Sequence, residues 1–234
     1  MRPVIAILFW WILFGGSHVA MSSTRWRPKL VARLGERGFL VVYSLVALVT
    51  FALLAHSYAH HKHAGWQLWQ TFGGSFLYLI VRDLNVALMA FAFILLVSGL
   101  VARPPSSMMP AGGTPEPYGV TRITRHPSFA AFWLFGIAHC LVNGGLTDLV
   151  FFGGLSVFSW LGATHQDSRK RADVPGYAEF TAATSFVPFA AIMKKQQPMP
   201  LHELSWGVIA FALLLFYLIR AYHPSMFGGV LMSL

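Results

Sequence analysis

Two histidines lie deep within apolar stretches of the chain. His18 follows the start MRPVIAILFWWILFGGS, and His139 lies in PSFAAFWLFGIAHCLVNGG. An ionisable group inside a membrane-spanning helix is costly to bury, so it indicates a functional site by default. Neutral imidazole is a ligand for haem iron and for zinc. His18 and His139 are therefore the candidate metal ligands of the chain, and a haem held between helices is one candidate cofactor.

The residues around His139 suit a bound haem. Asn143 comes one turn later and could orient the imidazole by a hydrogen bond to its second ring nitrogen. Arg122 and Arg125 precede the same apolar segment. The N-terminus of a helix favours anions, so these arginines could pair with haem propionates, or with the phosphate of a lipid or substrate.

Other arrangements of the histidines stay open. A histidine within the membrane is often only hydrogen-bonded to a neighbouring helix. His126 and His139 would lie ~20 Å apart along one helix and cannot hold the same ion. Counted along their helices, His18 and His139 differ by ~8 Å in depth. His56, toward the same side as His139, is the alternative partner. His56 also begins the pattern H-x3-H-H-x-H, which could bind a metal. The simpler interpretation is a solvent-exposed loop rich in histidine.

The composition indicates whether these residues lie in a membrane or in a water-soluble domain. Hydrophobic residues make up 56% of the chain and charged residues 11%, against about 25% charged in a soluble domain. We expect an all-α polytopic membrane protein forming a single domain over residues 1–234, with the lipid bilayer as its surroundings. Residues 65–83 are ambiguous between an interfacial segment and a loop. About six transmembrane helices are expected, over roughly 3–21, 38–55, 84–101, 128–142, 146–164 and 204–222.

The distribution of Lys and Arg predicts the orientation. The connections between helices 1 and 2, 3 and 4, and 5 and 6 hold 13 of the 17 Lys and Arg residues. Such connections are cytoplasmic, so both termini should be periplasmic and the protein should lie in a bacterial inner membrane. The net charge of +9 is then explained by orientation, and nucleic acid is not expected as a partner.

Several motifs resemble the NnrU family, which includes the 15-cis-zeta-carotene isomerases. They are GSHVAMSSTRWRPKLVARLGERGFLVVYSLVAL, RITRHP, AH with LVNG, and RKRADVPGYAEFTAATSFVPFAAI, in the family's order. The similarity covers nearly the whole chain. It implies a haem b protein in the isomerase branch, with His18 and His139 at the two histidines implicated there, and an apolar polyene as substrate. The bacterial branch implies a role in denitrification or nitric oxide metabolism.

One position departs from the isomerase pattern. The resemblance places a redox-active Cys three residues before the second histidine, and this chain has Gly136 there; its only cysteine is Cys140. The short motif TRHP is also similar to the isoprenylcysteine methyltransferases, although the Glu-Glu pair of that family is missing. A membrane methyltransferase and a non-catalytic assembly factor are therefore the alternative functions.

Overall fold

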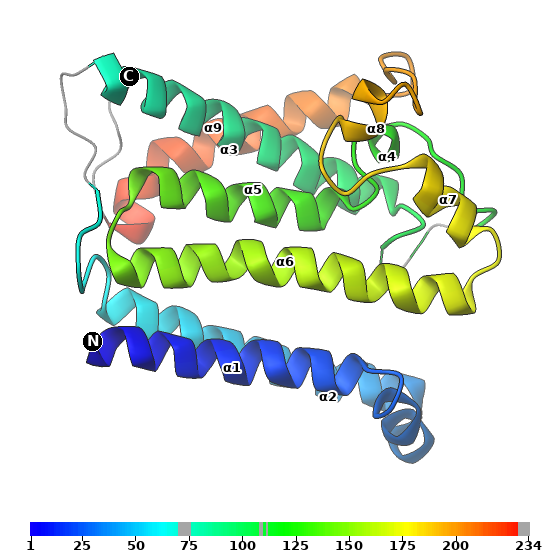
Figure 1. The fold of residues 1–234 in the computed structure, drawn as a ribbon, viewed down its shortest axis with the longest axis horizontal. Coiled ribbons are helices and arrows are strands. Elements are labelled where there is room, and N and C mark those ends of the chain that lie inside the picture. The colour runs from blue at the N-terminus through cyan, green and yellow to red at the C-terminus, as the bar shows by residue number, and fades with distance from the viewer. Residues whose placement is uncertain (70–75, 108–109, 111, 229–234) are drawn as a thin grey trace.

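The computed structural model describes residues 1–69, 76–107, 110 and 112–228, and in these residues it is all-α apart from one isolated β-bridge. Six long helices run side by side (Figure 1). Three short helices lie between them. The elements are α1 (Arg2–Ser22), α2 (Arg27–His60), α3 (Phe76–Ala102), α4 (Val120–Ile123), α5 (Pro127–Val142), α6 (Leu146–Asp173), α7 (Tyr177–Ala183), α8 (Ala190–Met193) and α9 (Trp206–Phe227).

The expected all-α membrane architecture is confirmed. In the described part of the chain, α1, α2, α3, α6 and α9 are long and apolar enough to cross a bilayer, and α5 is a shorter apolar helix of 16 residues. The ambiguous stretch 65–83 divides: residues 76–83 belong to α3, residues 70–75 lie outside the described residues, and residues 65–69 run beside the loop after α5.

The helices pack as a row in which α6 is central. α6 contacts both α1 and α5, α2 packs mainly on α1, and α3 packs on α5 and α9. Figure 1 shows α6 between α5 and α1. One core cluster joins α1, α2 and α6 through residues such as Ile7, Leu54 and Phe151. A second joins α3, α4 and α5 through residues such as Leu95, Ile123 and Ala130.

A glycine allows α5 and α6 to approach closely. A Cβ added to Gly136 would lie 2.2 Å from the Ser156 Oγ and 2.4 Å from the Phe152 carbonyl oxygen. Small residues at such contacts let backbones come together within a membrane. The Cys of the isomerase pattern could not stand at this position without separating the two helices. The close packing of α5 on α6 therefore explains why this chain has Gly136 where the isomerase pattern has a cysteine.

Candidate functional site

The densest polar cluster lies near the C-terminal end of α6, around the buried Asp167. Its carboxylate accepts hydrogen bonds from Arg125 Nε at 2.7 Å, His126 Nε2 at 2.7 Å and Tyr177 OH at 2.8 Å. Arg125 also donates to the Thr184 carbonyl at 2.9 Å. A carboxylate held by an arginine and two further donors keeps its charge when buried. The cluster therefore joins the start of α5 to α6 and α7.

The local sequence explains why His126 and Arg125 point inward. Pro127 occupies the first position of α5, where its missing N–H is not needed. His126 is the N-cap residue with non-helical backbone angles, φ −121° and ψ 68°, and makes no capping bond with its side chain. Its ring is thus free to reach Asp167. Arg125 is held through its N–H, which donates to the Ser185 carbonyl at 2.8 Å.

Burial controls the protonation of this cluster. Desolvation lowers the pKa of His126 despite the opposing effect of the Asp167 carboxylate. His126 therefore stays neutral and donates from Nε2, and its Nδ1 is buried with no hydrogen-bond partner among the described residues. Burial raises the pKa of the Tyr177 phenol, with the carboxylate of Asp167 adding to the shift. The tyrosine is therefore a permanent donor at ordinary pH.

Arg122 belongs to a separate ion pair. Its Nε donates to Glu203 Oε2 at 2.8 Å, and its Nη1 donates to Gln197 Oε1 at 2.5 Å. Arg122 and Arg125, expected as anion-binding groups at one helix start, thus both face carboxylates of their own chain. Sequence reasoning missed these partners because Asp167 and Glu203 lie 42 and 81 residues away in the chain.

His139 lies in an aromatic environment on α5. Its ring stacks on Phe152 of α6 at a centroid distance of 4.4 Å and also contacts Phe135 at 4.1 Å. Its Nδ1 donates to the Phe135 carbonyl at 2.9 Å, which leaves the Nε2 lone pair for a ligand. Asn143, expected to orient the ring, instead donates to the backbone carbonyl of His139 at 3.0 Å. The backbone of Phe135 therefore takes the orienting role.

His18 occupies a different aromatic environment. Its ring lies 4.6 Å from Tyr43 of α2, 5.3 Å from Phe158 of α6 and 5.7 Å from Phe14, between ring centroids. Its Nδ1 is buried without a hydrogen-bond partner in the described part of the chain. This nitrogen is therefore unused and could serve as a ligand atom. Leaving it buried without a partner is costly.

The structure does not bring His18 and His139 together. They contact Phe158 and Phe152, which lie six residues apart on α6. Six residues correspond to ~9 Å along a helix and ~120° around it. His18 approaches α6 from α1, whereas His139 approaches it from α5, on the opposite side (Figure 1). One planar group cannot contact both imidazoles with α6 in this position.

The other histidines do not supply the missing partner. His56 is exposed, and its ring lies 4.2 Å from that of His60. His223 of α9 lies within electrostatic range of His139, but its own Nδ1 is buried without a hydrogen-bond partner among the described residues. Within those residues, no three His, Cys, Asp or Glu side chains gather closely enough to hold a metal ion. The His-rich segment 56–63, interpreted from the sequence as a loop, begins within the last turns of α2, and among the described residues it forms no metal cluster.

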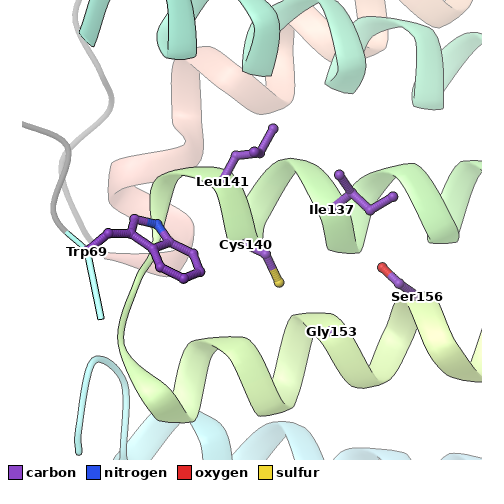
Figure 2. Close-up of a pocket in the computed structure, with 6 residues that line it drawn as sticks. All are labelled: Trp69, Ile137, Cys140, Leu141, Gly153 and Ser156. Atoms are coloured by element: carbon purple, nitrogen blue, oxygen red, sulfur yellow. The ribbon is translucent and has the colours of Figure 1, made fainter. Parts of the chain in front are cut away.

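An apolar groove lies at the end of the bundle away from Asp167, and it is lined by Cys140, the residue that follows His139. It has a volume of about 360 Å³ and runs between α5 and α6. Figure 2 shows Trp69 at one end of it, with Cys140 and Ser156 on facing helices. The Ser156 hydroxyl donates to the Trp133 carbonyl at 2.9 Å, so it offers the groove no free proton. The lining residues are Trp69, Ile137, Cys140, Leu141, Gly153 and Ser156.

Residues 65–69, called here the strap, run beside the loop after α5 and position Trp69. Leu68 N donates to the Gly144 carbonyl at 2.9 Å, and Leu146 N donates to the Trp66 carbonyl at 2.9 Å. Gly144 permits this approach, because an added Cβ would lie 2.1 Å from the Trp69 carbonyl oxygen. The strap is fixed further by Asp148, which accepts a hydrogen bond from His63 Nδ1 at 2.9 Å.

Comparisons with known proteins agree with the motifs. The sequence model of the family described as NnrU protein matches residues 6–230. The 15-cis-zeta-carotene isomerase, chloroplastic, of Arabidopsis thaliana is 28% identical over 205 residues, covering 85% of this chain and 53% of the relative. The Zea mays protein of the same name is 26% identical over 201 residues, covering 84% and 52%. The chain thus spans about half the length of these relatives. No solved structure matches.

Proposed function

Because the chain belongs to the NnrU family, we propose that it is a membrane protein with isomerase-like activity on an apolar, unsaturated substrate, and that it binds haem b through His139. The carrying observation is the groove between α5 and α6, which is lined by Cys140, the residue after His139, together with the half-buried His139 imidazole, whose Nε2 is free. Two relatives are named 15-cis-zeta-carotene isomerase, which supports a long apolar substrate.

The residues present fit a haem at His139 better than a haem shared by two histidines. The Phe135 carbonyl fixes the His139 tautomer, a common feature of metal-binding histidines. His18 has an unused Nδ1 and stays the predicted second ligand, but it can serve only if α1 and α6 shift. A bound haem would supply a redox-active Lewis acid beside the groove.

The groove would bind and orient the substrate without polar contacts. Ile137, Leu141 and Gly153 offer an apolar surface, and apolar surface excludes water from the double bonds of a polyene. Cys140 also lines the groove, one turn after Gly136. Its contribution is to the shape of the site, since the chain has no second cysteine with which to form a disulfide.

Spectroscopy tests the cofactor. The purified protein should show a reduced-minus-oxidised spectrum of haem b, and His139→Ala should abolish it. His18→Ala and His56→Ala identify the second ligand, and His202→Ala, at an exposed position, is the control. A protein without haem after supplementation, or an unchanged spectrum in His139→Ala, would remove His139 as the ligand.

Filling the groove tests the substrate. Ile137→Trp should reduce conversion of a cis-polyene at least about tenfold, because a tryptophan occupies much of the groove. Val157→Trp, at an exposed position on α6, should leave conversion unchanged. Product formation is followed by absorbance. Equal conversion by Ile137→Trp and the unmodified protein would move the substrate site elsewhere.

The alternative functions make different predictions. Arg125 and His126 carry the resemblance to methyltransferases, and both are bound to Asp167, so calorimetry with S-adenosylmethionine should give no heat of binding. Micromolar binding would favour methyl transfer. A protein that lacks haem, converts no polyene and co-purifies with a nitric oxide-metabolising complex would instead be an assembly factor.

The proposed location is a bacterial inner membrane with both termini periplasmic. The three connections rich in Lys and Arg lie at one end of the bundle (Figure 1). In a Cys140→Ser background, Lys62→Cys should react with an impermeant thiol reagent on intact cells and Thr114→Cys should not. The reverse pattern would invert the orientation.

A further inference from the structure

The start of α2 departs from the axis of the bundle. Gly35 has φ +70° and ψ 165°, a conformation that glycine adopts most easily, and it interrupts the helix between residues 27–34 and 36–60. In Figure 1 the first turns of α2, at the lower right, are seen nearly end-on, whereas α1 and the rest of α2 run across the view. The residues before Gly35 therefore lie across the end of the spanning helices, and residues 25–37, which include the break, are called here the basic arm.

The basic arm carries an unbalanced charge. It holds five cations and one carboxylate, a net charge of +4. Four of the cations recur at every fourth residue: Arg25, Lys29, Arg33 and Arg37. Lys29 and Arg33 therefore share one face of the helix, where like charges repel. Among the described residues, none of these four takes part in an ion pair, so the arm offers a cationic row without a partner in the chain.

The fifth cation holds the arm in place. Arg27 Nη2 donates to Glu36 Oε2 at 3.1 Å, across the break at Gly35. The same guanidinium lies 5.4 Å from the ring centroid of the buried Phe39. These two contacts join the arm to the spanning part of α2.

The apolar residues of the basic arm are of the types found at the interface between membrane and water. Trp26 is 51% exposed and Leu34 is 44% exposed. Lys29 Nζ lies 5.5 Å from the centroid of the Trp26 ring. Tryptophan is enriched where lipid headgroups meet the hydrocarbon, and helices with Lys or Arg on one side and Trp or Leu on the other lie in that plane.

We propose that the basic arm is a binding site for the headgroups of anionic phospholipids. Its position at the end of spanning helices puts Lys29 and Arg33 at the level of the lipid phosphates. Each Lys or Arg near a membrane surface strengthens its attraction to anionic lipid. This site is independent of the proposed function, because it lies on the outer side of α2, which packs mainly on α1 and not on α5.

Lipid titration of the full-length protein in a neutral detergent tests the site. Native mass spectrometry should show phosphatidylglycerol bound at least about tenfold more tightly than phosphatidylcholine. The double variant Lys29→Gln/Arg33→Gln should lose most of this preference, and Lys29→Arg/Arg33→Lys should keep it. The matched control Lys194→Gln/Lys195→Gln removes two exposed charges from the same end of the bundle and should change the preference little.

Three results would overturn the proposal. The first is equal binding of the two lipids by the unmodified protein. The second is a preference that survives in Lys29→Gln/Arg33→Gln. The third is an equal loss in the Lys194 and Lys195 control, which would mean a response to total charge alone. Size-exclusion chromatography checks folding; should the first variant aggregate, the single variants Lys29→Gln and Arg33→Gln each remove one of the two charges and must each lower the preference.

Discussion

α6 carries a buried aspartate at each end, and the two are stabilised by different means. Asp148 and Asp167 lie 19 residues apart, or ~28 Å along a helix, close to the ~30 Å thickness of a bilayer core. Each accepts a hydrogen bond from a tyrosine at 2.8 Å. Each also accepts one from a histidine, at 2.9 Å for Asp148 and 2.7 Å for Asp167. The two ends of α6 thus use the same kinds of donor.

The two aspartates differ in that Asp167 is paired with an arginine, Arg125, whereas Asp148 is paired with a histidine. Asp148 lies in the first turn of α6, where the free N–H groups and the helix dipole favour a negative charge. Its histidine, His63, has a side chain that is 56% exposed. Asp167 lies near the other end, where the dipole gives no such help, and there Arg125 supplies the positive charge. A buried carboxylate therefore needs a cation where the helix itself does not compensate it.

The largest effect is expected from Asp167→Asn. The change leaves Arg125 without its carboxylate, and breaking a buried charged pair costs about 3–5 kcal/mol. Thermal unfolding in detergent should show the largest destabilisation of any substitution discussed. Asp173→Asn, at an exposed position of the same helix, is the control and should change stability little. Similar values for both variants would mean that the Asp167 cluster does not hold α5, α6 and α7 together.

Asp148→Asn should be less harmful. No arginine is left behind, and the loss is that of hydrogen bonds from Tyr58 and His63 to a charged acceptor, about 1–3 kcal/mol. Tyr58→Phe removes one of these bonds and should cost less than Asp148→Asn. Tyr217→Phe, on an exposed face of α9, is the control. A larger destabilisation for Asp148→Asn than for Asp167→Asn would reverse the comparison.

The neutral state of His126 predicts a loss of stability in acid. Burial depresses its pKa in the folded protein, so below about pH 6.5, the ordinary pKa of histidine, the unfolded chain binds a proton that the folded chain does not. Stability should be fully present above that pH and fall as the pH drops. His126→Gln should flatten the slope of unfolding free energy between pH 7 and 5, whatever its effect at neutral pH. An unchanged slope would show that His126 is not the group responsible.

The spanning helices could be predicted because hydropathy is a local property. All six expected segments coincide with α1, α2, α3, α5, α6 and α9, and the family was identifiable from motifs that run in order along the chain. The ends were less accurate. α6 continues from the expected residue 164 to Asp173, because the polar residues of its last turns are buried by α7 and the loop before α4.

The ion pairs could not be predicted because their partners are distant in sequence. Arg125 and His126 directly precede an apolar helix in the sequence, whereas their common acceptor, Asp167, lies in the distant segment THQDSRKRAD. Asp148 follows an apolar stretch. Nothing in the sequence around it indicated the hydrogen bond from Tyr58, which lies 90 residues away. The available signal was that two of the three acids of α6, Asp148 and Asp167, lie about one bilayer thickness apart along the helix.

The smallest effect is expected at the Arg122–Glu203 pair, which is the exposed counterpart of the Arg125–Asp167 pair. The two side chains are 21% and 25% exposed, against 15% and 5% for Arg125 and Asp167. The hydrogen bond from Arg122 lowers the pKa of Glu203, so its contribution is present above the ordinary carboxyl pKa and is lost as the pH falls through the depressed value. Because solvent screens such a pair, Glu203→Gln should cost about 0–1 kcal/mol at neutral pH, with a difference from the unmodified protein that vanishes in acid. Unfolding measured in parallel at pH 7 and at a pH well below the depressed pKa of Glu203 checks both points. A cost equal to that of Asp167→Asn would show that exposure does not distinguish these two arginine–carboxylate pairs.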